Sequence, residues 1–332
     1  MIFYHPDCDL RFSEYGIEIP IVDDRASHVF SALQFLYPFL EYTDLKSLEK
    51  ITRVDLARVH TKEFMGRLLG SAGDRQAEIY KCYELVNDQG QFERFNPKNQ
   101  KRDWKELVET VLLQAAMTHA STNYALKNGF SYYLGGGMHH SMSFAGRGFC
   151  LVNDTVITLK KMQAEGKIKT AWIVDVDVHK GDGAPELLQN DSTIKTMSIH
   201  MKEGWPLNSG SVRDPWFIPS TVDVGLDIGE EDQYLARLEA GLLELEEIAP
   251  KPDIVIVVNG ADPFEHDELS SASFLNLTKE QMLARDKFLY QFFKSKSIPQ
   301  SYVMAGGYGL KSWEIYLQFL KFVGENTSFL QK

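Results

Sequence analysis

One stretch, residues 171–183, constrains the fold of this 332-residue chain more than any other. It reads AWIVDVDVHKGDG, so an apolar, β-branched run passes directly into Asp175, Asp177 and His179 at every second position. On an extended strand a period of two places these three side chains on one face. Two carboxylates and an imidazole at the end of a buried strand need a cation or hydrogen-bonding partners, because they lose their hydration. The stretch therefore predicts a buried strand over 171–178 that ends at a metal site.

Similar apolar runs alternate along the chain with stretches of helical periodicity. The runs predict further strands at 131–134, 194–199, 254–258 and 302–305, and a short one at 58–60. Helical spacing and capping residues predict helices at 104–127, 154–164, 232–248, 278–293 and 312–323, and one beginning near 184. Turn-forming residues predict loops at 87–99 and 203–219. This alternation indicates an α/β fold with an open parallel sheet covered by helices on both faces, and nothing divides residues 1–332 into more than one domain.

The composition excludes several classes of partner. A formal net charge of -11 argues against a nucleic-acid-binding surface and is mildly favourable for a cationic substrate such as a lysine-rich peptide or a polyamine. No apolar stretch approaches the roughly 20 residues that cross a bilayer, and residues 1–10 lack the pattern of a signal peptide. Three widely separated cysteines suit reduced thiols. We therefore expect a cytoplasmic protein that binds neither membrane nor nucleic acid.

Four of the predicted strands end in polar or glycine-rich segments. These segments are GGGMHH at 135–140, DVDVHKGDG at 175–183, NGADP at 259–263 and AGGYG at 305–309. In open parallel sheets the ligand lies outside the carboxyl ends of the strands, so the four segments should converge on one crevice. Asp262 would then join Asp177 and His179 in a set of ligands that suits zinc and is also compatible with Fe(II). The alternative is a solvated strand end whose carboxylates cap helices and form salt bridges.

The neighbouring His139 and His140 are candidates for a general base and a general acid, because imidazole titrates near neutral pH. Such residues need carboxylates that fix their tautomers, and Asp175 and Asp182 are available for this. Tyr308, between glycines at a strand end, could donate a hydrogen bond to an oxyanion opposite the metal. Taken singly, these features would equally suit a surface histidine pair and an ordinary glycine turn.

Two aromatic residues are candidates for the walls of a narrow channel. Phe149 follows Gly148 in the segment GRGFC, and Trp205 lies in the predicted loop 203–219. A core position is the ordinary expectation for Phe149. Trp205 could equally cover an edge of the core.

In combination, these motifs resemble the zinc-dependent histone deacetylase family. The motifs are GGGMHH, GRGFCLVND at 146–154, DVDVHKGDG, SIH at 198–200, NGADP and AGGYG, and their order and approximate spacing match over roughly residues 130–320. The similarity is greatest to bacterial members, which include protein-deacetylase-like and acetylpolyamine-amidohydrolase-like enzymes. The resemblance implies the arginase/deacetylase-like fold, with the active site at the carboxyl ends of the strands.

The resemblance also implies a role for each matching residue. Zinc would be held by Asp177, His179 and Asp262. His139 and His140 would act as the acid–base pair, oriented by Asp175 and Asp182, with Tyr308 polarising the substrate carbonyl. A structural potassium ion would be held by Asp175, Asp177, His179, Ser198 and Ile199. Phe149 would line the acyl-lysine channel, which the Gly148 carbonyl faces, and Trp205 would form its rim.

The implied function is removal of acetyl or longer acyl groups from lysine side chains of proteins or peptides, by metal-activated water. Alternatives are an acetylpolyamine or other small acylated-amine deacetylase and a non-enzymatic acyl-lysine binding module. A di-manganese hydrolase of arginase type is disfavoured, because 259–267 lacks a dense run of aspartates. One departure is Lys180, where many members have a second histidine; a cation near His140 and Asp182 could shift their pKa values. Acyl-chain length and oligomeric state are left open.

Overall fold

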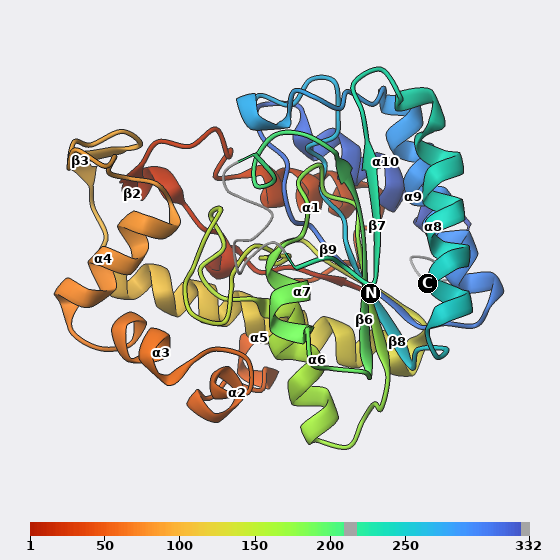
Figure 1. Ribbon diagram of the computed structural model, residues 1–332, viewed down its shortest axis with the longest axis horizontal. Helices are drawn as coiled ribbons and strands as arrows, with labels where there is room; N and C mark the ends of the chain where they lie inside the picture. Colours follow the sequence, from red (N-terminus) through yellow and green to blue (C-terminus); the bar gives the residue numbers. More distant parts are fainter. Residues whose placement is uncertain (209–217, 327–332) are drawn as a thin grey trace.

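A parallel β-sheet is the centre of the computed structural model, which describes residues 1–208 and 218–326 (Figure 1). Within those residues seven strands lie in the order β1-β4-β9-β8-β5-β6-β7, and every neighbouring pair is parallel. The strands are β1 (Ile2–Phe3), β4 (Phe130–Tyr133), β5 (Ala171–Asp175), β6 (Ile194–Met201), β7 (Val222–Leu226), β8 (Ile254–Val258) and β9 (Gln300–Val303). The predicted fold class, an α/β protein with a parallel sheet, is confirmed.

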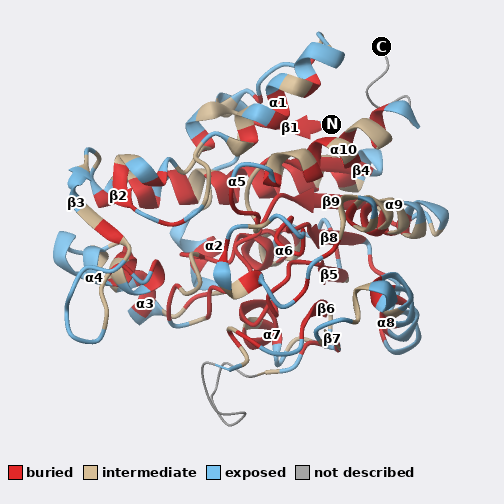
Figure 2. Ribbon diagram, turned by 90° about the horizontal axis from the view of Figure 1, so that it is seen from above, coloured by how far each residue is buried: buried red, intermediate tan, exposed pale blue. Residues whose placement is uncertain are grey.

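Helices cover both faces of this sheet, and Figure 2 shows the buried strands between partly exposed helices. One face packs against α1 (Arg25–Leu36), α8 (Tyr234–Ile248), α9 (Lys279–Ser295) and α10 (Ser312–Glu325). The other packs against α5 (Trp104–Asn128), α6 (Asp154–Ala164) and α7 (Gly183–Leu188). Alternate residues of β5 serve the two layers: Trp172 and Val174 join the first core, and Ala171 and Ile173 the second. This is why the strand reads as a continuous apolar run. No helix in the described parts of the chain is long and apolar enough to cross a membrane.

A smaller lobe packs beside the N-terminal half of α5. It contains α2 (Arg53–Ala57), α3 (Lys62–Leu68), α4 (Ala72–Cys82) and the antiparallel pair β2 (Tyr15–Ile17) and β3 (Phe95–Gln100). The strand predicted at 58–60 is wrong, because the capping box between Thr52 and Asp55 starts helix α2 just before it. The loop predicted at 87–99 is wrong at its end, where Phe95 begins β3.

The helices predicted from capping signals begin and end close to the predicted residues. Thr278 caps α9 through a capping box with Gln281, Asn153 caps α6, and Gly129 ends α5 in a left-handed conformation. The strand predicted over 171–178 is shorter than expected, because β5 ends at Asp175. The loop predicted at 203–219 falls partly on 209–217, which lie outside the described residues.

The chain order of the sheet determines where a ligand site forms. From β5 the chain continues to β6 and β7 on one side, and it then returns to β8 and β9 on the other side. The order therefore reverses between β5 and β8, and open α/β sheets bind ligands at the carboxyl ends of strands at such a point. Asp177 and His179 follow β5 and Asp262 follows β8, so the reversal brings these residues together.

The end of α5 allows a clean test of backbone strain. Gly129 has φ +88°, and a Cβ added there would meet nothing within 4 Å. Gly129→Ala should lower the free energy of unfolding in urea by about 1 kcal/mol, because an L-residue is strained in this conformation. The matched control is Gly66→Ala, inside α3 and equally open, which should raise it by roughly 0.5–1 kcal/mol. A gain at both positions would contradict this account of the α5 terminus.

Candidate metal and acid–base site

Three side chains form a compact group beyond the ends of β5 and β8. Asp177, His179 and Asp262 are buried, and each offers a ligand atom within 4.8 Å of the others. The Nδ1 atom of His179 lies 3.2 Å from Asp177 Oδ1 and 3.2 Å from Asp262 Oδ2. The Nε2 atom lies 3.1 Å from the Ser271 hydroxyl. Two carboxylates and an imidazole at this spacing are a donor set that holds Zn²⁺ or Fe²⁺.

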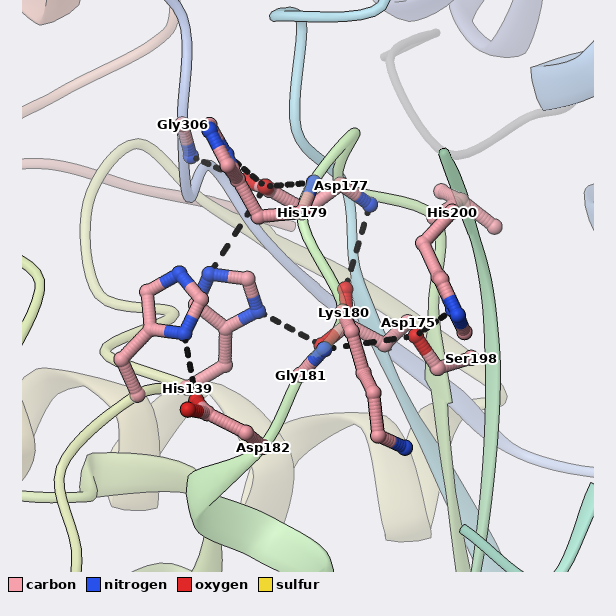
Figure 3. A network of polar contacts seen from close by, with 12 residues as sticks. His139, Asp175, Asp177, His179, Lys180, Gly181, Asp182, Ser198, His200 and Gly306 are labelled. Carbon is pink, nitrogen blue, oxygen red and sulfur yellow. Dashed lines mark hydrogen bonds and ion pairs between the residues drawn. The ribbon is translucent and has the colours of Figure 1, made fainter. Parts of the chain in front are cut away.

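Backbone amides fix the two carboxylates of this group. Val178 N–H donates to Asp262 Oδ1 over 3.0 Å. Gly306 N–H donates to Asp177 Oδ2 over 3.1 Å (Figure 3). A Cβ on Gly306 would lie 2.6 Å from Asp262 Oδ2, and one on Gly260 would lie 2.6 Å from Asp177 Oδ2. Glycine is therefore required at both positions, because the backbone itself forms the wall around the carboxylates.

Burial and neighbouring charges shift the pKa values of this group in opposite directions. Burial raises the pKa of Asp262, and the neighbouring Asp177 raises it further, to about 6. Burial also acts to raise the pKa of Asp177, but the nearby His139 and His179 outweigh it and hold that pKa below its usual range. For His179, burial lowers the pKa and the two carboxylates raise it more, to about 9. A bound cation would relieve this crowding of negative charge.

The two neighbouring histidines face this group, and each has a carboxylate of its own. His139 Nδ1 lies 2.7 Å from Asp175 Oδ2, and His140 Nδ1 lies 2.6 Å from Asp182 Oδ1. The imidazole rings are 3.9 Å apart between centroids, and His139 Nε2 is 3.7 Å from Asp177 Oδ1. The structure thus brings together the two histidines, the two orienting aspartates and the ligand group that the sequence suggested.

The environments of the two rings differ. Burial lowers the pKa of His139, but the charges of Asp175 and Asp177 outweigh it and raise the value to about 10. For His140, burial and the neighbouring His139 lower the pKa to about 3, although Asp182 opposes them. Without a metal ion, His139 therefore carries a proton and His140 is neutral at pH 7.

A narrow cavity of about 120 Å³ leads to the site, and its lining includes Phe149, Trp205 and Tyr308. Phe149 stacks on Tyr83 with centroids 6.3 Å apart, and Trp205 lies edge-on to His140 at 4.5 Å. A Cβ on Gly148 would lie 2.3 Å from the Trp205 ring, so this glycine lets the indole approach. The structure thus places the predicted channel residues together, with Phe149 half-buried instead of in the core.

Several residues around the site were not found from the sequence. The Tyr308 N–H donates to Asp267 Oδ2 over 2.7 Å, and the Arg25 guanidinium donates to the carbonyls of Ala305 and Gly307. These contacts hold the glycine turn that carries Tyr308. Arg147 donates to Asp182 Oδ2 over 2.9 Å. All of these contacts join segments far apart in the chain, and no local pattern marks them.

The residues suggested for potassium lie beside one another on β5 and β6 and their continuations. Asp175 and Ser198 are direct partners in the sheet register, and Ile199 follows Ser198 in β6. The Ser198 hydroxyl accepts the N–H of Gly181 over 3.3 Å and lies 3.0 Å from His200 Nδ1.

Lys180 does not direct its charge toward the acid–base pair. Its side chain leads away from His139 and Asp182 (Figure 3). The ammonium group donates to both carboxylate oxygens of Asp223, over 2.8 and 2.9 Å, and is almost fully buried. The cation expected near His140 and Asp182 is therefore paired with a side chain of β7, where Asp223 balances its charge.

Comparison with known proteins shows which family the chain is similar to. A family model described as a histone deacetylase domain matches residues 19–319. The acetoin utilization protein AcuC of Bacillus subtilis is 24% identical over 90% of this chain and 74% of its own length. Histone deacetylase 2 of Arabidopsis thaliana is 26% identical over 81% of this chain, and the alignment spans 65% of the plant protein. Acetylpolyamine aminohydrolase from Burkholderia pseudomallei superposes with a TM-score of 0.71 at 18% identity, covering 97% of this chain and 98% of that one.

The fold and the family match define the class of protein. The chain belongs to the histone deacetylase family. Membership indicates a deacetylase, which is a hydrolase, and implies a metal cofactor.

A second group, Glu49, His119 and Glu165, also gathers possible ligand atoms within 4.8 Å. This group differs from the first group because lysine ammonium groups already pair with its carboxylate. The ammonium groups of Lys161 and Lys167 each lie 2.8 Å from a Glu165 oxygen. These cations neutralise the carboxylate, and we do not expect a metal ion there.

Adding zinc to metal-free protein should show which of the two groups binds the ion. Adding Zn²⁺ at about 100 times its dissociation constant to EDTA-treated protein should stabilise the fold by about 2.7 kcal/mol, measured as a rise in melting temperature. Asp262→Asn should lose most of this gain, because a neutral amide is a weaker ligand. Glu165→Gln, the control in the second group, should keep it. An equal loss in both variants would contradict the assignment.

Proposed function

We propose that the protein is a zinc-dependent amidohydrolase that removes acetyl or longer acyl groups from lysine side chains of proteins or peptides. One observation carries the proposal. Two imidazoles, each held by its own buried carboxylate, face a three-residue ligand group at the end of a narrow channel that Tyr308 lines. Each part has a familiar role in the hydrolysis of an amide, and the channel suits a long, thin acylated side chain.

The residues present fit a zinc ion. Asp177, His179 and Asp262 offer two carboxylates and one imidazole, and a catalytic zinc site commonly has three protein ligands. The glycine backbone at 260 and 306 leaves room for nothing larger than hydrogen beside these carboxylates. When bound, the metal supplies Lewis-acid polarisation of the amide carbonyl and a lowered pKa for water. Fe²⁺ would suit the same donors.

His140 is the ring of the pair that is unprotonated and therefore free to accept a proton. Its Nδ1–H donates to Asp182, which leaves the lone pair of Nε2 available. Because its pKa is lowered, the ring is neutral and can take a proton from water at Nε2 and pass it to the departing amine nitrogen. His139, held by Asp175, is charged before metal binding. A cation held by Asp177 and Asp262 would lower its pKa toward the neutral range.

Tyr308 lines a cavity together with Asp177 and His179, and there it would supply a hydrogen-bond donor. Burial raises the pKa of its phenol far above the usual value, with Asp262 and Asp177 adding to the effect, so the hydroxyl keeps its proton. A neutral phenol can donate to the carbonyl oxygen as negative charge develops on it. Phe149 and Trp205 would enclose the apolar methylenes of a lysine side chain and exclude water.

A potassium ion is the second cofactor that we propose. Asp175, Asp177, His179, Ser198 and Ile199 would hold it, mainly through backbone carbonyls. Their side-by-side placement on β5, β6 and the segment after β5 supports this. The cation would support the loop that carries two zinc ligands.

The charges at the channel entrance favour a lysine substrate over a polyamine. Among the described residues that line this cavity, Glu84 is the one carboxylate, and Arg94 pairs with it over 2.9 Å. A polyamine carries further ammonium groups, which would find this carboxylate already neutralised. The alternative, an acetylpolyamine deacetylase, is supported by the structural likeness to acetylpolyamine aminohydrolase and by the net charge of -11. The binding-module alternative is weakened by the complete set of catalytic positions.

Tyr308→Phe tests the role of the phenol. We expect turnover of an acetyl-lysine peptide to fall by about 100-fold, because one donor to the oxyanion is lost. The zinc content, measured by elemental analysis, should stay normal, since Tyr308 is not a ligand. Tyr316→Phe is a control, because its hydroxyl donates to the Gly306 carbonyl in the same turn. Unchanged turnover in Tyr308→Phe would rule out the proposed role.

A substrate panel tests the reaction itself. Zinc-loaded protein should release acylate from acetyl-lysine or longer acyl-lysine peptides with a higher kcat/KM than from acetylpolyamines, and a hydroxamate should inhibit it. A preference for acetylpolyamines would support the alternative enzyme. A zinc-loaded protein that binds acyl-lysine peptides but hydrolyses none of these substrates would support a binding module.

A further inference from the structure

A buried arginine on a surrounding helix contacts both segments that carry the ligand group. Arg285 lies on α9, and its side chain is 0% exposed. Its Nη1 atom donates to the carbonyl of Val176 over 3.0 Å and to the carbonyl of Gly260 over 2.9 Å. Val176 directly precedes Asp177, and Gly260 lies two residues before Asp262.

These two carbonyls lie where the sheet has ended. β5 stops at Asp175 and β8 at Val258, and these two residues are partners in the register. Beyond them one more backbone bond, from the Val176 N–H to the Val258 carbonyl over 3.0 Å, joins the two segments before the ladder ends. Past that bond, one nitrogen of a rigid guanidinium contacts a carbonyl of each segment, so it constrains their separation at the point from which the ligands extend.

Arg285 is itself held in place. Its Nε donates to Asp286 Oδ1 over 2.9 Å, and the same oxygen accepts the side-chain amide of Asn259 over 2.8 Å. The side-chain oxygen Oδ1 of Asn259 in turn accepts a hydrogen bond from the Tyr132 hydroxyl over 3.0 Å. Asn259 directly precedes Gly260, so the network extends from β4 through the end of β8 to α9. A side chain fixed from both sides can transmit a defined geometry to the backbone it contacts.

A purely structural ion pair is the competing explanation. A buried pair often contributes little net stability, because desolvation offsets the attraction, and apolar residues can replace it. That explanation gives no reason for one nitrogen to bridge the carbonyls of two ligand-bearing segments.

We propose that Arg285 is a positioning residue of the metal centre. Its guanidinium fixes the spacing of the segments after β5 and β8, and through them it sets the geometry and affinity of the Asp177, His179 and Asp262 ligand set. This inference rests on the proposed function only in that the ligand set binds a divalent metal.

The test measures metal binding directly. The dissociation constant for Zn²⁺ would be obtained by competition with a chromophoric chelator, and the ligand geometry from the visible spectrum of Co²⁺-substituted protein. Arg285→Lys keeps the charge but loses the planar fork. The double variant R285M/D286L removes both charges without leaving one unpaired. We expect both to bind Zn²⁺ about tenfold or more weakly and to show an altered Co²⁺ spectrum, with the smaller effect for Arg285→Lys.

The control is Leu289→Ala, a buried position on the same helix. It should lower the melting temperature while the Zn²⁺ affinity and the Co²⁺ spectrum stay as in the unsubstituted protein. If the Arg285 variants behave like Leu289→Ala, with lower stability but unchanged metal affinity and spectrum, the inference is wrong. An unsubstituted protein that binds Zn²⁺ but hydrolyses no acyl substrate would overturn the proposed function and leave this test intact. A protein that binds no Zn²⁺ would overturn this inference too.

Discussion

Burial of negative charge is the constraint on which the rest of the site depends. Four carboxylates, those of Asp175, Asp177, Asp182 and Asp262, are buried in the candidate metal and acid–base site. A carboxylate removed from water without partners costs several kcal/mol, so each must accept hydrogen bonds or neutralise a cation. Two of them accept from histidines, and the other two accept from backbone amides. The pair that accepts from backbone amides, Asp177 and Asp262, is also the pair that shares the His179 imidazole in the candidate metal group.

The parallel sheet makes this concentration of charge feasible. At the carboxyl ends of parallel strands the chain leaves the ladder, so backbone N–H groups become available to accepting side chains. Val178 and Gly306 use their N–H groups in this way. The reversal of chain order between β5 and β8 then brings the two ligand-bearing segments side by side. The strands provide the apolar core, and the same strands end at the point where polar groups are needed.

The fold and much of the site composition could be predicted from the sequence, because both leave local signals. Apolar runs and caps located β4, β5, β6, β8 and β9 and the helices α5, α6, α8, α9 and α10, whereas α1 and α4 were not predicted. The residues at the strand ends are the ones that converge. The edge strands β1 and β7 were not predicted from the sequence, because β1 has two residues and β7 has an exposed residue among its apolar ones. Contacts across the chain could not be predicted, including the pairing of Lys180 with Asp223. Arg285 did leave a signal. With Asp286 it occupies the same buried stripe of α9 as Met282 and Leu289, where apolar side chains are expected.

The two histidines show how strongly the surroundings of a side chain change its pKa. His139 and His140 are adjacent in the chain and each has an aspartate at Nδ1, so their sequence context predicts similar rings. Their pKa values diverge because His139 also lies 3.7 Å from Asp177, whereas His140 has a protonated histidine as its neighbour. Each ring therefore influences the other. A cation held by Asp177 would weaken the charge that keeps His139 protonated, and loss of that proton would in turn ease the repulsion that lowers the pKa of His140. Metal binding and the acid–base pair are therefore coupled, and the contact between His139 and Asp177 contributes to that coupling.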